Sequence, residues 1–329
     1  MKANKIRLNG EVLLDLTADT ATPETVAEGV TFHMADGTPA TGAMIPTEDL
    51  DAELTEQEDL IANLKEKLTS GSGGGGSGGG GGFDADTYFE SGLTEIDLPN
   101  ITSLRDAAFC GDTTIVNLSI PKVTDIGDSA FQDCVNLAMT ELPEGVTRIG
   151  YKAFYNCQNL ALTELPDGVT FVSDQAFYGC YKLTWTKLPD GLTSIGFYTF
   201  QNCTNLALTK LPDGVTSISN SAFSGCTKLA LTKLPDGLTS IPQYAFYNCT
   251  NLALTEIPGE VKSIASYAFY NCTGLNTITF KSKVNSISSS AFAGCTNLTI
   301  INVPWAEREV ANAPWGATNA TINYNYAGG

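Results

Sequence analysis

The sequence has few basic residues and almost no histidine. It contains 18 Lys and Arg against 36 Asp and Glu, which gives a formal net charge of -18, and a single His among 329 residues. Proteins bind phosphate backbones and anionic lipid surfaces through Lys and Arg side chains that displace counterions. A chain this acidic is therefore predicted not to bind nucleic acid.

The sequence also lacks any long apolar run. No stretch approaches the roughly 20 consecutive apolar residues that a membrane helix requires, so membrane insertion is not expected. The first residues, MKANKIRLNGEVLLDL, lack the apolar segment of a secretory signal. We therefore expect a chain that stays in the cytosol or leaves it without a signal peptide.

Residue pairs suited to metal or acid-base chemistry are missing as well. None of the nine Cys lies two to four residues from another, which is the spacing of zinc ligands, so no metal or cofactor is expected. His33 has no acid, Ser or Cys arranged around it. Asp167, Asp190, Asp213 and Asp236 follow Pro in turns, where Asp caps its own backbone. The chain is predicted not to be an enzyme, and a paired-carboxylate glycosidase is the catalytic alternative.

What the sequence does have is a repeat of 23 residues. A Phe, usually preceded by Ala, recurs at this interval and is followed three residues later by Cys. The Phe column is Phe131, Phe154, Phe177, Phe200, Phe223, Phe246, Phe269 and Phe292, and the Cys column is Cys134, Cys157, Cys180, Cys203, Cys226, Cys249, Cys272 and Cys295. An imperfect earlier unit has Phe109 and Cys110, so residues 93–303 form a nine-unit array.

Each repeat is too short to close a core by itself. A unit has about seven apolar positions, so neighbouring units are expected to stack and bury a continuous core, as in a solenoid. We expect a mostly β fold with short turns or helices, with one strand in segments such as 206–212 and a shorter one at the GVTSI sequences. Coils stacked about 4.8 Å apart would span roughly 40 Å. The Cys column is predicted to point inward as a small apolar filler, with oxidation between neighbouring coils as the alternative.

Three shorter regions precede the repeats. Residues 1–46 are predicted to be a small β-rich module, with a hairpin around Asn9-Gly10 and one short helix after Thr22-Pro23. Residues 47–68 are predicted to form a helix, and residues 69–82 a Gly/Ser linker with an end-to-end distance of roughly 20 Å. Such a tether would let the two halves move independently.

The helix at 47–68 carries a heptad seam. Its positions are spaced 4-3-4-3-4 and are Leu50, Leu54, Gln57, Ile61, Leu64 and Leu68. Three heptads are marginal alone, so we expect a homo-oligomerisation helix, with a trimer favoured over a dimer. The alternative is a single helix folded onto the first module.

Aromatic and basic surface columns are the candidates for binding. Tyr residues stand beside the Ala-Phe motifs at positions where other units carry Ser, Gln or Lys, so the core does not require a ring there. Exposed Tyr offers a large, rigid contact area. The predicted receptor-contact residues are Tyr155, Tyr178, Tyr181, Tyr198, Tyr244, Tyr247, Tyr267, Tyr270, Trp185, Lys187, Lys210 and Lys233. The alternatives are packing of the Tyr rings on the convex side and a merely solvated lysine face.

The repeats resemble a known family. Units such as LPDGVTSISNSAFSGCTKLALTK (211–233) are similar to BspA-like leucine-rich repeats of the Treponema pallidum type, which occur in bacterial surface adhesins and in bacteriophage proteins. Residues 12–44 resemble a module of phage tail and fibre proteins. Residues 305–326 resemble the C-terminal cap that accompanies it, which gives a cap domain at 304–329 after the repeat domain at 83–303.

This resemblance implies a location rather than a reaction. We expect a bacteriophage virion protein, a tail or head fibre assembled in the host cytoplasm. Its first module would bind other virion proteins, and its repeats would bind a bacterial cell-surface polysaccharide or protein. The alternative is a bacterial surface or secreted adhesin that acts as a protein-binding module.

Overall fold

The structure is a computed structural model that describes residues 5–8, 11–15 and 94–327. The chain divides into two compact units, Met1–Gly76 and Ser77–Gly329. In the first unit, β1 (Lys5–Leu8) and β2 (Glu11–Asp15) pair antiparallel, which agrees with the hairpin predicted around Asn9-Gly10. The rest of the predicted module, the helix at 47–68 with its heptad seam, and the linker at 69–82 lie outside the described residues.

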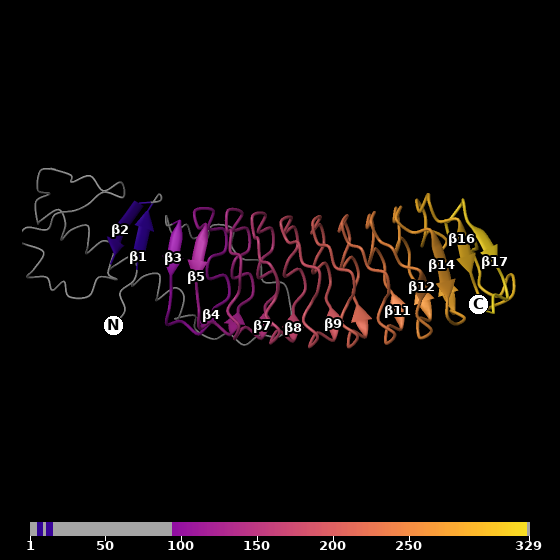
Figure 1. Ribbon diagram of the computed structural model, residues 1–329, viewed down its shortest axis with the longest axis horizontal. Coiled ribbons are helices and arrows are strands. Elements are labelled where there is room, and N and C mark those ends of the chain that lie inside the picture. The colour runs from indigo at the N-terminus through magenta and orange to yellow at the C-terminus, as the bar shows by residue number, and fades with distance from the viewer. Residues whose placement is uncertain (1–4, 9–10, 16–93, 328–329) are drawn as a thin grey trace, which may run out of the picture. The chain divides into compact units, whose positions relative to one another are not determined.

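The second unit is a β-solenoid whose coils stack along one axis (Figure 1). One strand per coil comes from the GVTSI sequences, where the sequence analysis predicted the shorter of two strands. These strands are β4 (Ser103–Leu104), β6 (Asp125–Ile126), β7 (Arg148–Ile149), β8 (Phe171–Val172), β9 (Ser194–Ile195), β10 (Ser217–Ile218), β11 (Ser240–Ile241), β13 (Ser263–Ile264) and β15 (Ser286–Ile287). The pairs are parallel, and the second residue of each strand is buried.

A second ladder of strands is present only towards the ends of the solenoid. It comprises β3 (Glu95–Asp97) and β5 (Asn117–Ser119) at one end, and β12 (Glu256–Ile257), β14 (Thr277–Phe280), β16 (Ile300–Asn302) and β17 (Thr321–Asn323) at the other. The strand predicted at 206–212 is wrong: none of these residues is in a strand. Its backbone still bonds the preceding coil, since Ala207 N donates to Trp185 O at 3.0 Å, but Thr209 N reaches Thr186 O only at 3.4 Å.

The core is built from stacked columns of identical residues. The rings from Phe109 to Phe292 are fully buried and form one continuous stack, with centroids 5.1–5.8 Å apart and planes within 14° of parallel. Successive rings bury each other's faces, so a unit removed from the stack would expose both faces of its ring. The coils are therefore interdependent, as expected for units that cannot fold alone.

The segments around the Phe column contain no helix among the described residues 94–327, so of the short turns or helices expected in the repeats these residues form turns. Most coils have two residues in the left-handed region. One stands two before Phe, as in Tyr198 (φ 57°) and Tyr244 (φ 57°), and the other two after it, as in Asn202 (φ 61°) and Gly225 (φ 77°). Two positive φ values within five residues interrupt helical hydrogen bonding and turn the chain back into the next coil. Within the described ranges no helix is long and apolar enough to cross a bilayer.

The C-terminal residues continue the stack. Strand β17 pairs in parallel with β16, and Phe292 N donates to Trp315 O at 2.9 Å, as the preceding Phe residues do to the next coil. Trp305 and Trp315 are buried against Phe280. The solenoid therefore has about ten coils rather than the nine predicted, because this tail covers the last repeat with a coil of its own.

Candidate functional site: aromatic clusters on the turn face

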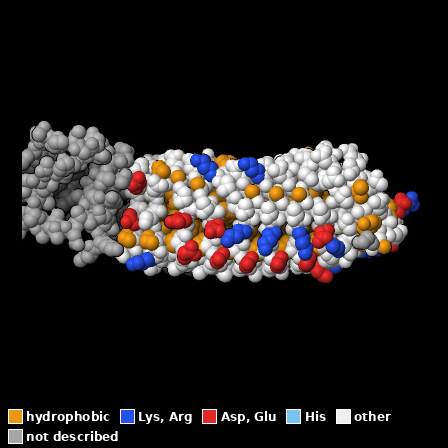
Figure 2. Space-filling view, in the orientation of Figure 1, with side chains coloured by type: hydrophobic (Ala, Val, Ile, Leu, Met, Phe, Trp, Pro, Cys, Tyr) orange, Lys and Arg blue, Asp and Glu red, His pale blue; other side chains and the backbone are white. Residues whose placement is uncertain are grey.

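One face of the solenoid carries a row of basic side chains beside a row of acidic ones (Figure 2). The predicted lysines Lys187, Lys210 and Lys233 are exposed. Lys187 pairs with Glu164 at 3.1 Å, and Lys233 pairs with Asp236 at 3.2 Å. The hydrogen bond and charge of Glu164 raise the pKa of Lys187. Two of the three predicted lysines are therefore already paired with acidic side chains.

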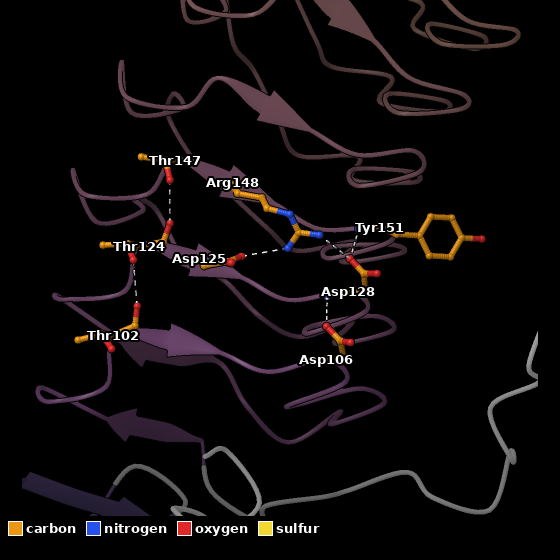
Figure 3. Close-up of polar contacts among 8 residues, drawn as sticks. All are labelled: Thr102, Asp106, Thr124, Asp125, Asp128, Thr147, Arg148 and Tyr151. Carbon is orange, nitrogen blue, oxygen red and sulfur yellow. Dashed lines mark hydrogen bonds and ion pairs between the residues drawn. The ribbon is translucent and has the colours of Figure 1, made fainter. Parts of the chain in front are cut away.

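The turns around the Ala-Phe motifs form a second surface, here called the turn face, which comprises 128–136 and the seven equivalent segments at 23-residue intervals up to 289–297. Carboxylates fix the start of several of these turns. Asp128 Oδ1 accepts hydrogen bonds from the backbone N–H of Tyr151 at 2.8 Å and from Arg148 Nη2 at 3.3 Å, and Arg148 Nη1 also binds Asp125 at 3.1 Å. The ring of Tyr151 points away from the solenoid (Figure 3).

The first aromatic cluster lies on the turns that begin at Tyr151 and Asp174. Tyr155 and Tyr178 are stacked with ring centroids 4.6 Å apart. The Lys152 ammonium lies 5.2 Å from the ring centroids of both Tyr151 and Tyr155, a distance at which the cation and the ring faces attract. Partial burial and the neighbouring Tyr178 raise the pKa of the Tyr155 hydroxyl above the usual value for tyrosine.

Two exposed phenylalanines were missed by the sequence analysis: Phe197 begins the turn segment 197–205, and Phe171 lies in β8, three residues before the turn that begins at Asp174. Phe171 is 49% exposed and Phe197 is 45% exposed, more than any other large hydrophobic side chain among the described residues. Tyr198 and Tyr181 are exposed nearby in the chain. The signal was present in the columns, because other coils carry Ser194 or Ser217 where Phe171 stands, and Asp174 or Asn220 where Phe197 stands.

The second aromatic cluster is a block of four predicted tyrosines, here called the tyrosine tetrad: Tyr244, Tyr247, Tyr267 and Tyr270. Across adjacent coils, Tyr244 stacks on Tyr267 at 5.4 Å and Tyr247 stacks on Tyr270 at 4.8 Å, with planes 2° and 8° from parallel. Within each coil the two rings meet edge to face at 5.6 and 5.7 Å. Sequence columns alone placed these residues near each other, and the structure brings all four into contact.

Trp185 does not belong to the surface. It is 1% exposed, its indole Nε1 donates to Leu162 O at 2.7 Å, and its ring packs edge-on between Phe177 and Phe200. It replaces the Leu that other coils carry in the core, such as Leu208. The prediction that Trp185 contacts a receptor is therefore wrong, because the side chain points into the core and its one polar atom is already bonded.

The cysteine column points inward as predicted, and each thiol has a backbone partner. Cys226 Sγ lies 3.0 Å from Phe200 O in the preceding coil, and the other seven column members make the same contact at 2.9–3.1 Å. Burial raises the pKa of these thiols, that of Cys295 to about 12. In the part of the chain that the structure describes, no three His, Cys, Asp or Glu residues are grouped to hold a metal ion.

Comparison with protein families agrees with this geometry. The sequence profile of the BspA type leucine-rich repeat region matches residues 83–207 and 195–313, which together cover well over half of the chain. The chain belongs to the BspA type leucine-rich repeat family. The stacked Phe and Cys columns are therefore the core of this chain's BspA type repeats. No curated protein sequence matches the chain.

Solved leucine-rich repeat proteins share this architecture. A leucine-rich repeat protein from Bacteroides ovatus aligns with 23% identity and a TM-score of 0.54, covering 70% of this chain and 68% of its own. A leucine-rich cell surface protein from Faecalibacterium prausnitzii aligns with 24% identity and a TM-score of 0.42, covering 72% and 88%. The T. pallidum leucine-rich repeat protein aligns with 28% identity and a TM-score of 0.41, covering 55% and 78%. The first of these supports the solenoid fold of the BspA type repeats.

Proposed function

We propose that this chain is a non-catalytic adhesin that binds a macromolecule on a cell surface through the turn face of its BspA type repeats and the adjoining exposed side chain of β8. The observation that supports this most directly is the placement of rings in otherwise polar columns. Phe171, Phe197 and Tyr198 are exposed at positions where other coils carry Ser, Asp, Asn or Gln. Exposed aromatic side chains in a cluster are typical of contact surfaces, since they bury large area at little entropic cost.

The chemistry of the described residues favours binding over turnover. The thiols of the Cys column are buried, neutral and bonded to carbonyls, and the turn acids Asp128 and Asp174 are engaged by backbone N–H groups of the next coil. A general acid or base must lie within hydrogen-bond reach of the substrate proton that it transfers. Release of reducing ends from polysaccharides by the purified chain would contradict this part of the proposal.

Display on a bacterial cell surface is the setting we favour, because the family resemblance of the repeats includes bacterial surface adhesins. A virion fibre is the second candidate. It rests on the resemblance of residues 12–44 and 305–326 to parts of phage tail proteins, and several weak sites on tethered copies would gain avidity there. Immunodetection in cell-surface fractions and in purified virions from the same culture separates the two settings.

The binding proposal is tested with variants that restore the usual residues of each column. The triple variant Phe171→Ser, Phe197→Asn and Tyr198→Ser uses side chains that other coils carry at the same positions, so the fold should be retained. We expect labelled full-length chain to bind bacterial cells or mucin-coated surfaces, and the triple variant to bind at least about tenfold more weakly, which corresponds to about 1.4 kcal/mol. Tyr326→Ser, which removes an exposed ring outside the turn face, serves as the control. Equal binding by the triple variant and the parent would exclude this cluster as the contact surface.

A further inference from the structure

The turn face loses its charge towards the C-terminal half of the repeats. The five segments 197–205, 220–228, 243–251, 266–274 and 289–297 contain one charged residue, Lys228, although the whole chain carries a net charge of -18. The remaining side chains there are Tyr, Phe, Asn, Gln, Ser, Thr and small apolar residues. An ionic ligand would lose hydration on this surface and find no opposite charge, which is unfavourable. The surface therefore selects an uncharged partner.

The tyrosine tetrad is the aromatic centre of this uncharged surface. Its four rings form two stacked pairs that meet edge to face, with Tyr267 36% exposed and the other three partly exposed. The adjoining coils carry Ser221 and Ser224 on one side and Ser290 and Ala293 on the other, so the stacks stop after two rings. The block is therefore a local feature of two coils and not a property of the repeat.

The backbone does not explain these rings. Tyr244 and Tyr267 have φ values of 57° and 58°, a left-handed conformation that is strained for a bulky side chain. The other left-handed column of the repeat is filled as backbone chemistry favours, with Asp133, Asn156, Gly179, Asn202, Gly225, Asn248, Asn271 and Gly294. Tyrosine in the first column therefore supplies something other than turn formation.

Hydrogen-bonding groups without charge border the tetrad. Asn271 Nδ2 donates to Asn248 Oδ1 at 3.0 Å, which fixes two partly exposed amides directly after Tyr247 and Tyr270. Gln243 and Ser266 directly precede Tyr244 and Tyr267. Amides and hydroxyls both donate and accept hydrogen bonds, as the hydroxyls of a sugar do, while a Tyr ring offers an apolar surface and a polar tip.

We propose that the tyrosine tetrad binds a neutral, hydroxyl-rich glycan, which names a ligand class for the adhesive function proposed above and rests on it. The C–H faces of the sugar rings pack on the Tyr rings, and its hydroxyls bond to the phenols and to the Asn248–Asn271 amides. A protein partner fits less well, because protein surfaces carry charged rims that this face does not complement.

The ligand class is tested by affinity electrophoresis of the full-length chain in gels that contain one polysaccharide each. Dextran, yeast mannan and laminarin are the neutral probes, and polygalacturonate and dextran sulfate are the anionic ones. We expect at least one neutral polymer to retard the chain. The retardation should persist in 0.5 M NaCl, where the Debye length is only about 4 Å and interactions between surface charges are screened. Retardation by anionic polymers alone, or by none of the neutral polymers, would overturn the proposal.

The site is tested with the variant Tyr244→Ser, Tyr247→Ser, Tyr267→Ser and Tyr270→Ala, which places the residues of adjoining coils at each position. We expect about a tenfold or greater loss of affinity for the neutral polymer, since central aromatic side chains dominate binding surfaces. The control Tyr326→Ser removes an exposed aromatic ring outside the turn face and should leave neutral-glycan affinity unchanged. Thermal unfolding of each variant establishes that it is folded, and a folded tetrad variant that binds like the parent would overturn the site.

Failure here is distinguishable from failure of the adhesive function. If the parent binds cells and the binding is abolished by protease treatment of the cells but survives periodate oxidation of their sugars, the ligand is a protein. The glycan site is then wrong and the adhesin proposal stands. If the parent binds no cell or mucin surface, the adhesive function itself is wrong.

Discussion

The carboxylate of Asp174 holds the backbone of Phe197 in the next coil, accepting its N–H at 2.8 Å. The residue before Phe197 is Gly196, where a Cβ atom would lie 2.3 Å from the same carboxylate oxygen. Asp128 relates in the same way to Tyr151 and Gly150, with a Cβ contact of 2.5 Å. Where one coil has a residue other than Asp at the position of Asp174, the next coil does not have Gly at the position of Gly196. The residues found there are Ser173, Ser219, Pro242, Ala265 and Ser288. An Asp in one coil therefore requires Gly in the next.

Gly196→Ala is expected to destabilise the solenoid because the added methyl group displaces the Asp174 carboxylate from Phe197 N–H. Loss of a hydrogen bond to a charged acceptor costs about 1.5–3 kcal/mol. The measurement is the midpoint of chemical unfolding. Gly214→Ala is the control, since the nearest atom to its Cβ would be Leu192 O at 3.7 Å, an ordinary contact.

The cause of that loss is tested with Asp174→Ala. This change alone should destabilise, but in its presence Gly196→Ala should cost less than in the parent, because the displaced carboxylate is gone. Additive effects of the two substitutions would show that Gly196 is needed for another reason.

Alkaline pH is expected to destabilise the repeats through the cysteine column. Burial raises the pKa of the column thiols in the folded state, whereas an unfolded thiol ionises near pH 8.5. The stability that the neutral buried thiols contribute is therefore fully present below about pH 8.5 and is lost as the pH rises above it. Each thiol lowers the free energy of unfolding by about 1.4 kcal/mol per pH unit in that range.

The measurement is denaturant unfolding at several pH values between 7 and 10 in the presence of a reductant. Cys226→Ser removes one member of the column. It should reduce the slope of the unfolding free energy against pH above pH 8.5 by about 1.4 kcal/mol per pH unit, which corresponds to one proton. An unchanged slope in this variant would mean that other groups cause the alkaline loss.

Charge is not expected to be tolerated in this column. Cys226→Asp places a carboxylate where the thiol is fully buried beside Phe200 O, so we expect destabilisation of several kcal/mol or failure to fold. Cys226→Ser keeps a small donor for the same carbonyl and should cost less. Comparison of soluble yield and unfolding midpoint ranks the two, and equal stability would contradict the inward orientation of the column.

Trp185→Leu is expected to leave receptor and glycan binding unchanged. The substitution restores the residue found at the equivalent position of other coils, such as Leu208, and affects only the core. Loss of the bond from the indole Nε1 to Leu162 O and of ring volume should destabilise by about 1–3 kcal/mol. Binding and unfolding are measured on the same preparation, and weaker binding by a fully folded variant would return Trp185 to the list of contact residues.

The heptad seam at residues 47–68 predicts an oligomer. Leu54→Glu with Ile61→Glu places charges at two seam positions and should convert the multimer into a monomer, because a buried seam excludes unpaired charge. Glu56→Lys lies outside the seam and is the control. The measurement is light scattering on the intact chains. A monomeric parent would remove the oligomer prediction.

Repetition made the architecture predictable. A Phe and a Cys that return every 23 residues can only form columns if coils stack, and the Phe109-to-Phe292 and Cys134-to-Cys295 columns are indeed stacked and buried. The balance between the two strand ladders was not predictable. Both segments have strand-like apolar patterns, and the difference depends on hydrogen-bond distances between coils, as at Thr209 and Thr186.

The candidate site was predictable only in part. Columns showed that Tyr244, Tyr247, Tyr267 and Tyr270 stand beside the core, but the sequence could not show that their rings meet in a block. Trp185 was in the same candidate set because the sequence does not show whether an unusual aromatic side chain points into the core or out to solvent. Phe171 and Phe197 were overlooked because Phe elsewhere in the repeat is always a core residue.

By itself, the sequence determined the period, the family, the acidic surface and the identity of the residues that fill the core columns, because these follow from composition and spacing along the chain. Only the tertiary structure decided that Trp185 points into the core, which surface rings touch and which carboxylates are already bonded. Those facts depend on contacts between residues 20–26 apart, and a pattern of residue types does not contain the distances between them.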